Sequence, residues 1–309
     1  MARSKQDIRR FIKLNSICSL LVLIFLILNL YIIFSLIVVN NKTNFEIKYF
    51  EDLLAFTEAN YDKKELELFL LEESINNIKN IENKISEIKH TYFNNAYLYE
   101  QKVIEGTGKK KIVYLTIDDG PSAYTNSFLN VLEKYDVLAT FFLIGNTSKQ
   151  YINIYDKISK NGHTIGNHTY THRIVNGVYR SSNIFIEDML KQEEFIFEKT
   201  GLKTDILRFP GGSKTAGSRK KPIIEKLKQL NYGYIDWNVA AGDANGVDIS
   251  KEGIYRYVIN GTKKRDIAVV LIHDFNRNSL YALSSIIEEL KENDYIFLPL
   301  FYESSKVIK

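Results

Sequence analysis

The sequence predicts an α/β fold in which about seven short strands alternate with helices and form a distorted (β/α) barrel. Apolar, β-branched runs of strand length lie at 112–117, 138–144, 163–167, 205–209, 233–237, 267–272 and 295–298. Amphipathic stretches of helical period separate them, at 124–134, 149–160, 183–199, 219–230, 249–260 and 279–292. Such alternation requires parallel strands with covering helices, and this number of units favours a barrel over an open sheet.

Composition excludes several classes of protein. The chain has 309 residues, room for about two domains or one large domain with accessory segments. Its net charge of +4 is small and no nucleic-acid-binding motif is present, so we expect no nucleic-acid partner. Cys18 is the single cysteine, which excludes an intrachain disulfide and a thiolate metal site. Candidate metal ligands are therefore carboxylates and the five histidines.

The N-terminal part predicts a membrane anchor. Residues 18–39 carry no charge and would form a helix of about 33 Å, enough to cross a bilayer core. Basic residues precede this run, so we expect residues 1–17 in the cytoplasm, a single span at 18–39 in the lipid bilayer, and the remainder outside the cell. A cleaved signal peptide is the alternative, but its apolar core would be shorter and followed by a small-residue cleavage site.

Residues 40–108 are expected to form a helical stalk. Neither glycine nor proline occurs between residues 41 and 104. Apolar residues recur at spacings near three and four, at Leu68, Leu71, Ile75, Ile78, Ile85 and Ile88. The pattern fits a weakly self-associating coiled coil or a helix packed on the main domain. Gly106 and Gly108 then mark a boundary, so the main domain is expected at 109–309.

Two adjacent carboxylates, Asp118 and Asp119, end the first predicted strand in the segment TIDDGP. Their desolvation is costly unless something pairs with them, and a metal ion would relieve that cost. The alternative is a turn that caps the next helix. The third strand ends in NHTYTH, where His168 and His172 are four residues apart. The residues between them are poor helix formers, which favours a loop around one ion over a helical site, the alternative being two unrelated surface histidines.

Three further strands end in functional side chains or glycines, in the segments RFPGG at 208–212, DWN at 236–238 and LIHD at 271–274. Arg208 can hold a carboxylate bidentately. Gly211 and Gly212 allow a ligand to approach the backbone and offer N–H donors. His273 is an acid or base candidate, or else a hydrogen-bonded structural residue.

These five segments, in this order and spacing, resemble the signature motifs of the polysaccharide deacetylases, the family 4 carbohydrate esterases with a NodB-homology domain. The resemblance covers about residues 110–302. It implies a distorted (β/α) barrel that binds one divalent metal ion. Zinc is the ion expected, and cobalt or manganese are the alternatives. It also implies hydrolysis of N-acetyl groups on an amino-sugar polymer.

The resemblance assigns the metal to Asp119, His168 and His172. Asp118 would be the general base that activates water, and Arg208 would orient it.

The remaining roles concern the substrate. The metal and the Gly211 N–H would stabilise the oxyanion, and His273 would protonate the leaving amine, with Asp236 tuning it. Trp237 and Leu271 would shape the pocket for the acetyl methyl group. The sequence departs from many members in having glycine rather than an aromatic residue at Gly211, so one aromatic wall of the sugar groove is missing.

We therefore expect an outward-facing, membrane-anchored deacetylase of an envelope polysaccharide, with peptidoglycan N-acetylglucosamine as substrate. An exported poly-N-acetylglucosamine or chitin-type polymer is the alternative substrate. Two other classes are considered. A non-catalytic glycan-binding scaffold would not need the full set of polar strand ends, and a hydrolase of small cyclic amides is disfavoured by the anchor, because such substrates are usually cytoplasmic.

Overall fold

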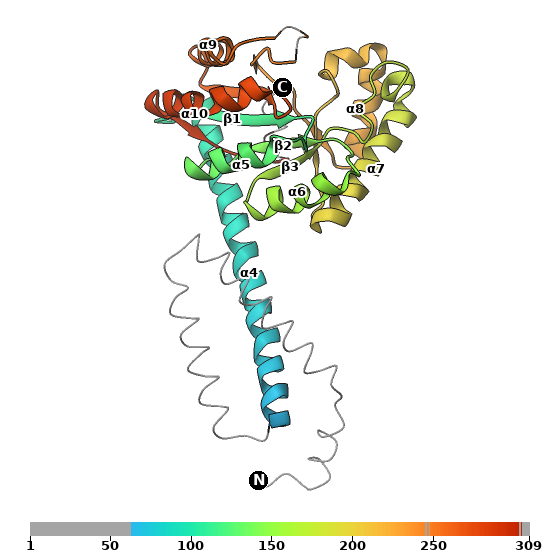
Figure 1. Ribbon diagram of the computed structural model, residues 1–309, viewed down its shortest axis with the longest axis vertical. Helices are drawn as coiled ribbons and strands as arrows, with labels where there is room; N and C mark the ends of the chain where they lie inside the picture. Colours follow the sequence, from blue (N-terminus) through green and yellow to red (C-terminus); the bar gives the residue numbers. More distant parts are fainter. Residues whose placement is uncertain (1–62, 245, 247, 303, 305–309) are drawn as a thin grey trace. The chain divides into compact units, whose positions relative to one another are not determined.

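The computed structural model describes residues 63–244, 246, 248–302 and 304 (Figure 1). The predicted basic segment 1–17, the predicted anchor 18–39 and the first part of the predicted stalk lie outside these residues. Within the described part, no helix combines the length and hydrophobicity needed to cross a membrane. The chain divides into two compact units, Met1–Tyr92 and Phe93–Lys309.

One long helix, α4 (Lys63–Ile104), runs through the boundary between these units. It ends just before Gly106, which adopts a left-handed φ of 73°. From Phe93 onward α4 belongs to the second unit, where Ala96 and Val103 are buried in the core. The second unit therefore begins inside the segment that we assigned to the stalk.

The second unit is built on one parallel sheet. Its strands are β1 (Lys111–Asp118), β2 (Thr140–Leu143), β3 (Thr164–Asn167), β4 (Ile206–Leu207), β5 (Gly233–Tyr234), β6 (Val239–Ala240), β7 (Ile267–His273) and β8 (Tyr295–Phe297). Seven of them follow the order β5-β4-β3-β2-β1-β7-β6. β8 pairs with the first residues of β1, Lys111 to Val113. β2 pairs with the last residues of β1, Thr116 to Asp118. The predicted (β/α) barrel is confirmed in this curled form, which stays open because β5 and β6 do not pair within the described chain.

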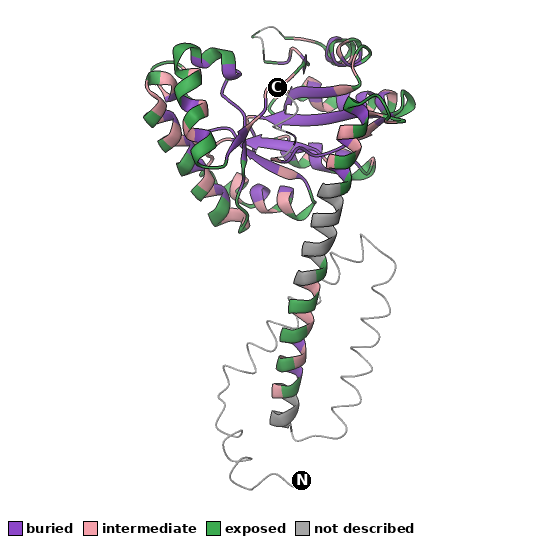
Figure 2. Cartoon of the chain, turned by 180° about the vertical axis from the view of Figure 1, so that it is seen from behind, coloured by how far each residue is buried: buried purple, intermediate pink, exposed green. Residues whose placement is uncertain are grey.

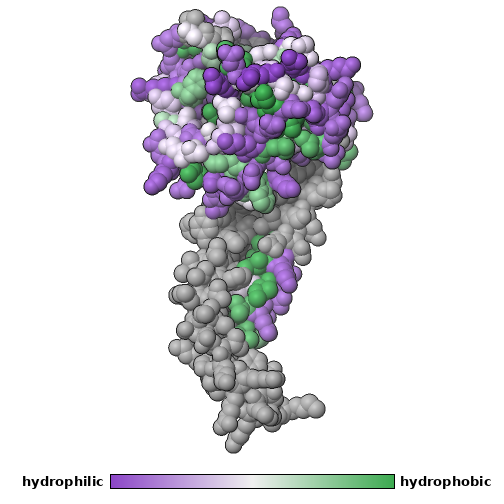
Figure 3. Space-filling view, turned by 90° about the vertical axis from the view of Figure 1, so that its right-hand side faces the viewer, coloured by the Kyte–Doolittle hydropathy of each residue, from purple (hydrophilic) through white to green (hydrophobic). Residues whose placement is uncertain are grey.

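Helices cover the outside of this sheet (Figure 1). They are α5 (Thr125–Lys134), α6 (Lys149–Lys160), α7 (Ser182–Thr200), α8 (Lys220–Gln229), α9 (Lys251–Thr262) and α10 (Arg277–Glu292), with two short 3-10 segments, η1 (Val178–Arg180) and η2 (Ser213–Arg219). Each helix turns an apolar face inward, as Leu283, Ile286 and Leu290 do in α10. Figure 2 shows the buried strands inside and exposed helix faces outside, and the face in Figure 3 is largely hydrophilic with smaller hydrophobic groups.

Strand β1 separates two parts of the core. Val113, Leu115 and Ile117 pack in a cluster with the covering helices. Ile112 and Tyr114 pack in the cluster that includes Ala96 and Val103 of α4. Because side chains alternate along a strand, Thr116 and Asp118 share the inner face with Tyr114. The barrel interior is thus apolar near α4 and polar at the C-terminal end of β1.

The packing of α4 can be tested by placing a charge on its buried face. Ala96 is 5% exposed, so Ala96→Arg should lower the free energy of unfolding by about 2 kcal/mol or more, because it buries an unpaired charge. Leu98, on the same helix, is 56% exposed, and Leu98→Arg should change stability by no more than about 0.5 kcal/mol. Urea denaturation measures both. Equal effects of the two variants would contradict the docking of α4.

Candidate active site

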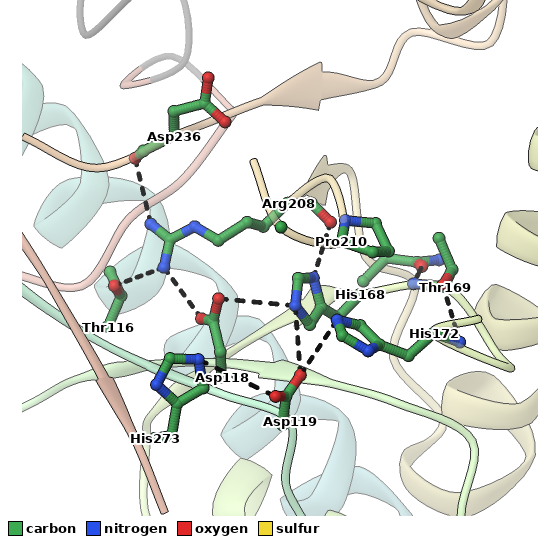
Figure 4. Close-up of polar contacts among 12 residues, drawn as sticks. Thr116, Asp118, Asp119, His168, Thr169, His172, Arg208, Pro210, Asp236 and His273 are labelled. Carbon is green, nitrogen blue, oxygen red and sulfur yellow. Dashed lines mark hydrogen bonds and ion pairs between the residues drawn. The ribbon is translucent and has the colours of Figure 1, made fainter. Parts of the chain in front are cut away.

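A buried ion pair lies at the C-terminal end of β1. Asp118 is almost fully buried, and its Oδ1 accepts a hydrogen bond of 2.9 Å from Nη1 of Arg208 (Figure 4). Arg208 is itself fully buried just after β4. A buried charge is tolerated only when paired and hydrogen-bonded, so this pair fixes both side chains.

The other hydrogen bonds of Arg208 explain why it contacts Asp118 through one nitrogen only. Nη1 also donates to the hydroxyl of Thr116 at 2.6 Å. Nε and Nη2 donate to the backbone carbonyls of Ile235 and Asp236, at 3.0 and 3.1 Å. The bidentate contact that we considered from the sequence is therefore absent. Thr116, which donates in turn to the carbonyl of Val270, is a positioning residue that the sequence did not reveal.

Beside this pair, Asp119, His168 and His172 bring three ligand atoms within 4.8 Å of one another. Oδ1 of Asp119 lies 3.4 Å from Nε2 of His168 and 3.3 Å from Nε2 of His172. This oxygen is buried and accepts no regular hydrogen bond within the described chain. The two imidazoles both face this carboxylate oxygen, and such a set of one carboxylate and two imidazoles suits a divalent metal ion.

The backbone around the cluster orients these ligands. Asp119, Thr169 and His172 have left-handed φ values of 68°, 64° and 49°, which are uncommon for residues other than glycine. Nδ1 of His168 lies 2.7 Å from the carbonyl of Arg208. That carbonyl can only accept, so Nδ1 donates to it, and Nε2 is the ring nitrogen that faces Asp119.

The pKa values of two members of the cluster suit metal binding. Burial alone would raise the pKa of Asp119, but its contact with His168 and the charges of His172 and His273 lower that pKa to about 2. Burial and the neighbouring His168 lower the pKa of His172, against the opposing effect of the two aspartates. At neutral pH the cluster therefore offers a charged carboxylate and an imidazole that is free to ligate.

His273, at the end of β7, is held by Asp243. Nδ1 of His273 lies 2.9 Å from Oδ1 of Asp243, and the backbone N–H of His273 donates to Oδ2 at 2.8 Å. The hydroxyl of Ser279 also donates to Oδ2. Burial alone would lower the pKa of His273, but Asp243, followed by Asp118 and Asp119, raises it above the usual value. Nε2 of His273 lies 3.8 Å from Oδ2 of Asp119, so this nitrogen faces the candidate metal ligands.

Our expectation that Asp236 tunes His273 is wrong. The Asp236 carboxylate accepts hydrogen bonds from the backbone N–H and hydroxyl of Ser213 and points away from His273 (Figure 4). It secures the turn after Gly212 instead. The sequence misled us because 233–237 was interpreted as one strand, whereas a second strand, β6, follows and delivers Asp243 to His273. The acidic residue after the Val-Ala-Ala-Gly run at 239–242 was the available signal.

A cavity of about 430 Å³ opens over these residues, a size suited to a small ligand. The predicted substrate residues Gly211, Trp237 and Leu271 all line it. Gly212 is locked as glycine, because its φ is 85° and an added Cβ would lie 3.0 Å from the Trp237 ring. The N–H of Gly211 donates to no described residue and remains available. The cavity is therefore lined by the three candidate metal ligands, by Asp118 and His273, and by a glycine with a free backbone donor.

Comparisons with known proteins find similarity to deacetylases of polysaccharides and peptidoglycan. A family model described as polysaccharide deacetylase matches residues 105–235. The peptidoglycan-N-acetylglucosamine deacetylase of Bacillus cereus is 31% identical over 203 residues, which cover 63% of this chain and 71% of that protein. The peptidoglycan-N-acetylmuramic acid deacetylase PdaA of Bacillus subtilis is 28% identical, covering 62% and 71%. Among solved structures, the catalytic domain of peptidoglycan N-acetylglucosamine deacetylase from Eubacterium rectale has 38% sequence identity and a TM-score of 0.60. The match covers 63% of this chain and 90% of that chain.

The two adjacent aspartates should differ in metal binding. Asp119→Asn should weaken zinc binding by more than about 100-fold, because it removes a charged ligand, whereas Asp118→Asn should change it by less than about tenfold. Isothermal titration of the metal-free protein with zinc measures both. The reverse order of affinities would overturn the division of roles between the two carboxylates.

The partner of His273 can be identified by titration. Asp243→Asn removes the negative charge that raises the pKa of His273, so that pKa should fall. Asp236→Asn is the matched control and should leave it unchanged. Nuclear magnetic resonance of the imidazole C–H protons as a function of pH gives the value in each protein. A fall in the Asp236 variant alone would restore our original assignment.

Proposed function

Because this chain belongs to the polysaccharide deacetylase family, we propose that it removes N-acetyl groups from peptidoglycan N-acetylglucosamine with the help of one divalent metal ion. The family and its named relatives make the chain a deacetylase enzyme. The observation that carries the proposal is the convergence of three metal-ligand side chains with the Asp118–Arg208 and His273–Asp243 pairs at one cavity.

The arrangement suits hydrolysis of an amide. Asp119, His168 and His172 would hold the ion, which supplies polarisation of the acetyl carbonyl and activation of water. Asp118, held by Arg208, takes the proton of the attacking water. The free N–H of Gly211 donates to the oxygen on which negative charge develops.

The leaving group requires a proton, because an amine departs poorly as an anion. The neighbouring carboxylates raise the pKa of His273, which favours its protonated form, and Asp243 orients the ring, so His273 gives this proton to the amide nitrogen as the C–N bond breaks. Trp237 and Leu271 shape an apolar wall for the acetyl methyl group. The products are acetate and a free amino sugar.

Zinc is the ion that we propose, since two imidazoles and one carboxylate form a donor set typical of catalytic zinc sites. Cobalt or manganese are the alternatives. Chelation should abolish activity, and adding back each metal separately identifies the ion that restores it.

One comparison and one prediction from the sequence support peptidoglycan as substrate. Several relatives are named for it, and a barrel anchored through residues 18–39 and a stalk would meet the cell wall first. The similarity to an N-acetylmuramic acid deacetylase supports a second candidate sugar. Mass spectrometry of wall fragments treated with the enzyme distinguishes them: deacetylated glucosamine supports our proposal, deacetylated muramic acid the second candidate, and unchanged fragments would turn attention to an exported poly-N-acetylglucosamine.

The anchored topology is part of the proposal. The uncharged run at 18–39 and the basic residues before it support a cytoplasmic N-terminus and an extracellular barrel. Protease added to intact cells should release the barrel, while a label directed at a cysteine introduced at Lys5 should fail to react from outside. Recovery of the barrel from the cytosol would contradict the topology. Self-association through the stalk stays a prediction from the apolar spacing.

The role of His273 can be separated from that of the other residues by choice of substrate. His273→Ala should slow hydrolysis of an N-acetyl sugar by about 100-fold or more, because the amine leaves unprotonated. An acetate ester with a good leaving group scarcely needs this proton and should be slowed far less. Steady-state rates on both substrates provide the test, and equal losses would exclude His273 as the acid.

A further inference from the structure

An exposed aromatic side chain, Phe275, lies in the wall of the active-site cavity and has no role in the mechanism above. It is 45% exposed, and it lines the cavity next to His273. Among the large hydrophobic side chains exposed on the described residues, it is the one found in this cavity. Single exposed hydrophobic residues are common on protein surfaces, so the feature that distinguishes Phe275 is its place in the wall of a cavity suited to a ligand.

The residues on both sides of Phe275 are held by the structure, and its ring packs beside His273. Its centroid lies 5.2 Å from that of the His273 ring, with 42° between the planes. On one side the chain is fixed by Asp274, which is fully buried. On the other side Asn276 donates to the carbonyl of Asp243 at 2.8 Å and caps helix α10. A preorganised ring loses little freedom on binding, which favours its use as a contact surface.

Other parts of the cavity wall offer less aromatic surface. Gly211 has no side chain. A side chain at this position would be strained, because the φ of Gly211 is 69° and an added Cβ would lie 3.2 Å from both Ile174 and Thr215. Trp237 is partly buried, and the centroid of its ring lies 5.7 Å from the guanidinium carbon of Arg208. Phe275 therefore provides the exposed aromatic face of this wall.

We propose that Phe275 is the platform on which the pyranose ring of the reacting sugar lies. This inference rests on the proposed function, in which His273 protonates the nitrogen attached to that same pyranose ring. A sugar ring bonded to a nitrogen beside His273 lies within reach of the neighbouring Phe275 ring. Its face of C–H groups is apolar and matches the flat aromatic surface, while its hydroxyl groups stay in water.

The test compares an oligosaccharide with a small ester. In the full-length protein, Phe275→Ala should raise KM for tetra-N-acetylchitotetraose about tenfold, because the apolar contact is lost, with kcat changed by less than about threefold. The loss in kcat/KM should be several times larger for this oligosaccharide than for 4-nitrophenyl acetate, which has no sugar. Phe275→Trp, which keeps an aromatic face, should restore KM to within about threefold of the original.

Phe197 provides a matched control, because it is a phenylalanine with 48% exposure on α7, outside the cavity. Phe197→Ala should leave both substrates unaffected. An unchanged KM in the Phe275→Ala protein would overturn the proposal. So would a fall in kcat alone, which would mean that Phe275 merely supports His273.

Failure of the proposed function would look different. If the unaltered protein released no acetate from the oligosaccharide, isothermal titration with the same tetrasaccharide would decide the question. About tenfold weaker binding by Phe275→Ala would support the platform, whereas equal affinities, or no binding by either protein, would overturn it.

Discussion

The ion pair between Arg208 and Asp118 is the interaction on which the rest of the site depends. Both side chains are buried in the barrel interior, so neither charge is tolerated there alone. Removing one partner of such a pair costs about 3–5 kcal/mol, because the other charge remains without compensation. Arg208 also joins the loops after β4 and β5 through backbone carbonyls and reaches Thr116 on β1. One guanidinium thus connects strand ends that carry candidate site residues.

The same principle repeats around the cavity, since three of the candidate site residues are each oriented by a hydrogen-bonded partner. Asp118 is held by Arg208, His273 by Asp243, and His168 by the carbonyl of Arg208. The partners fix direction and proton position, and the reactive atoms are left facing Asp119 or the cavity. This division explains why burial and reactivity coexist here, because the desolvation cost is offset by hydrogen bonds behind the reactive atoms.

Much of the site could be predicted because parallel strands place their C-terminal ends at one edge. Once the strands before Asp118, His168, Arg208 and His273 were recognised, their meeting followed from topology. The prediction for Asp236 failed because β5 and β6 are only two residues each, too short for a periodic signal. The path between them decides which carboxylate reaches His273, and Asp243 was missed for that reason.

The sequence alone determined the barrel class, because hydrophobic period is a local property, and it indicated the candidate site residues, because five short segments resemble the family's motifs in their order. Tertiary structure alone decided which partners these residues take: Asp243 for His273, Ser213 for Asp236, and a single nitrogen of Arg208 for Asp118. It also decided that the end of α4 packs in the core and that Phe275 lies open at the cavity. These features depend on loop paths and side-chain directions between residues far apart in the chain, which no local pattern encodes.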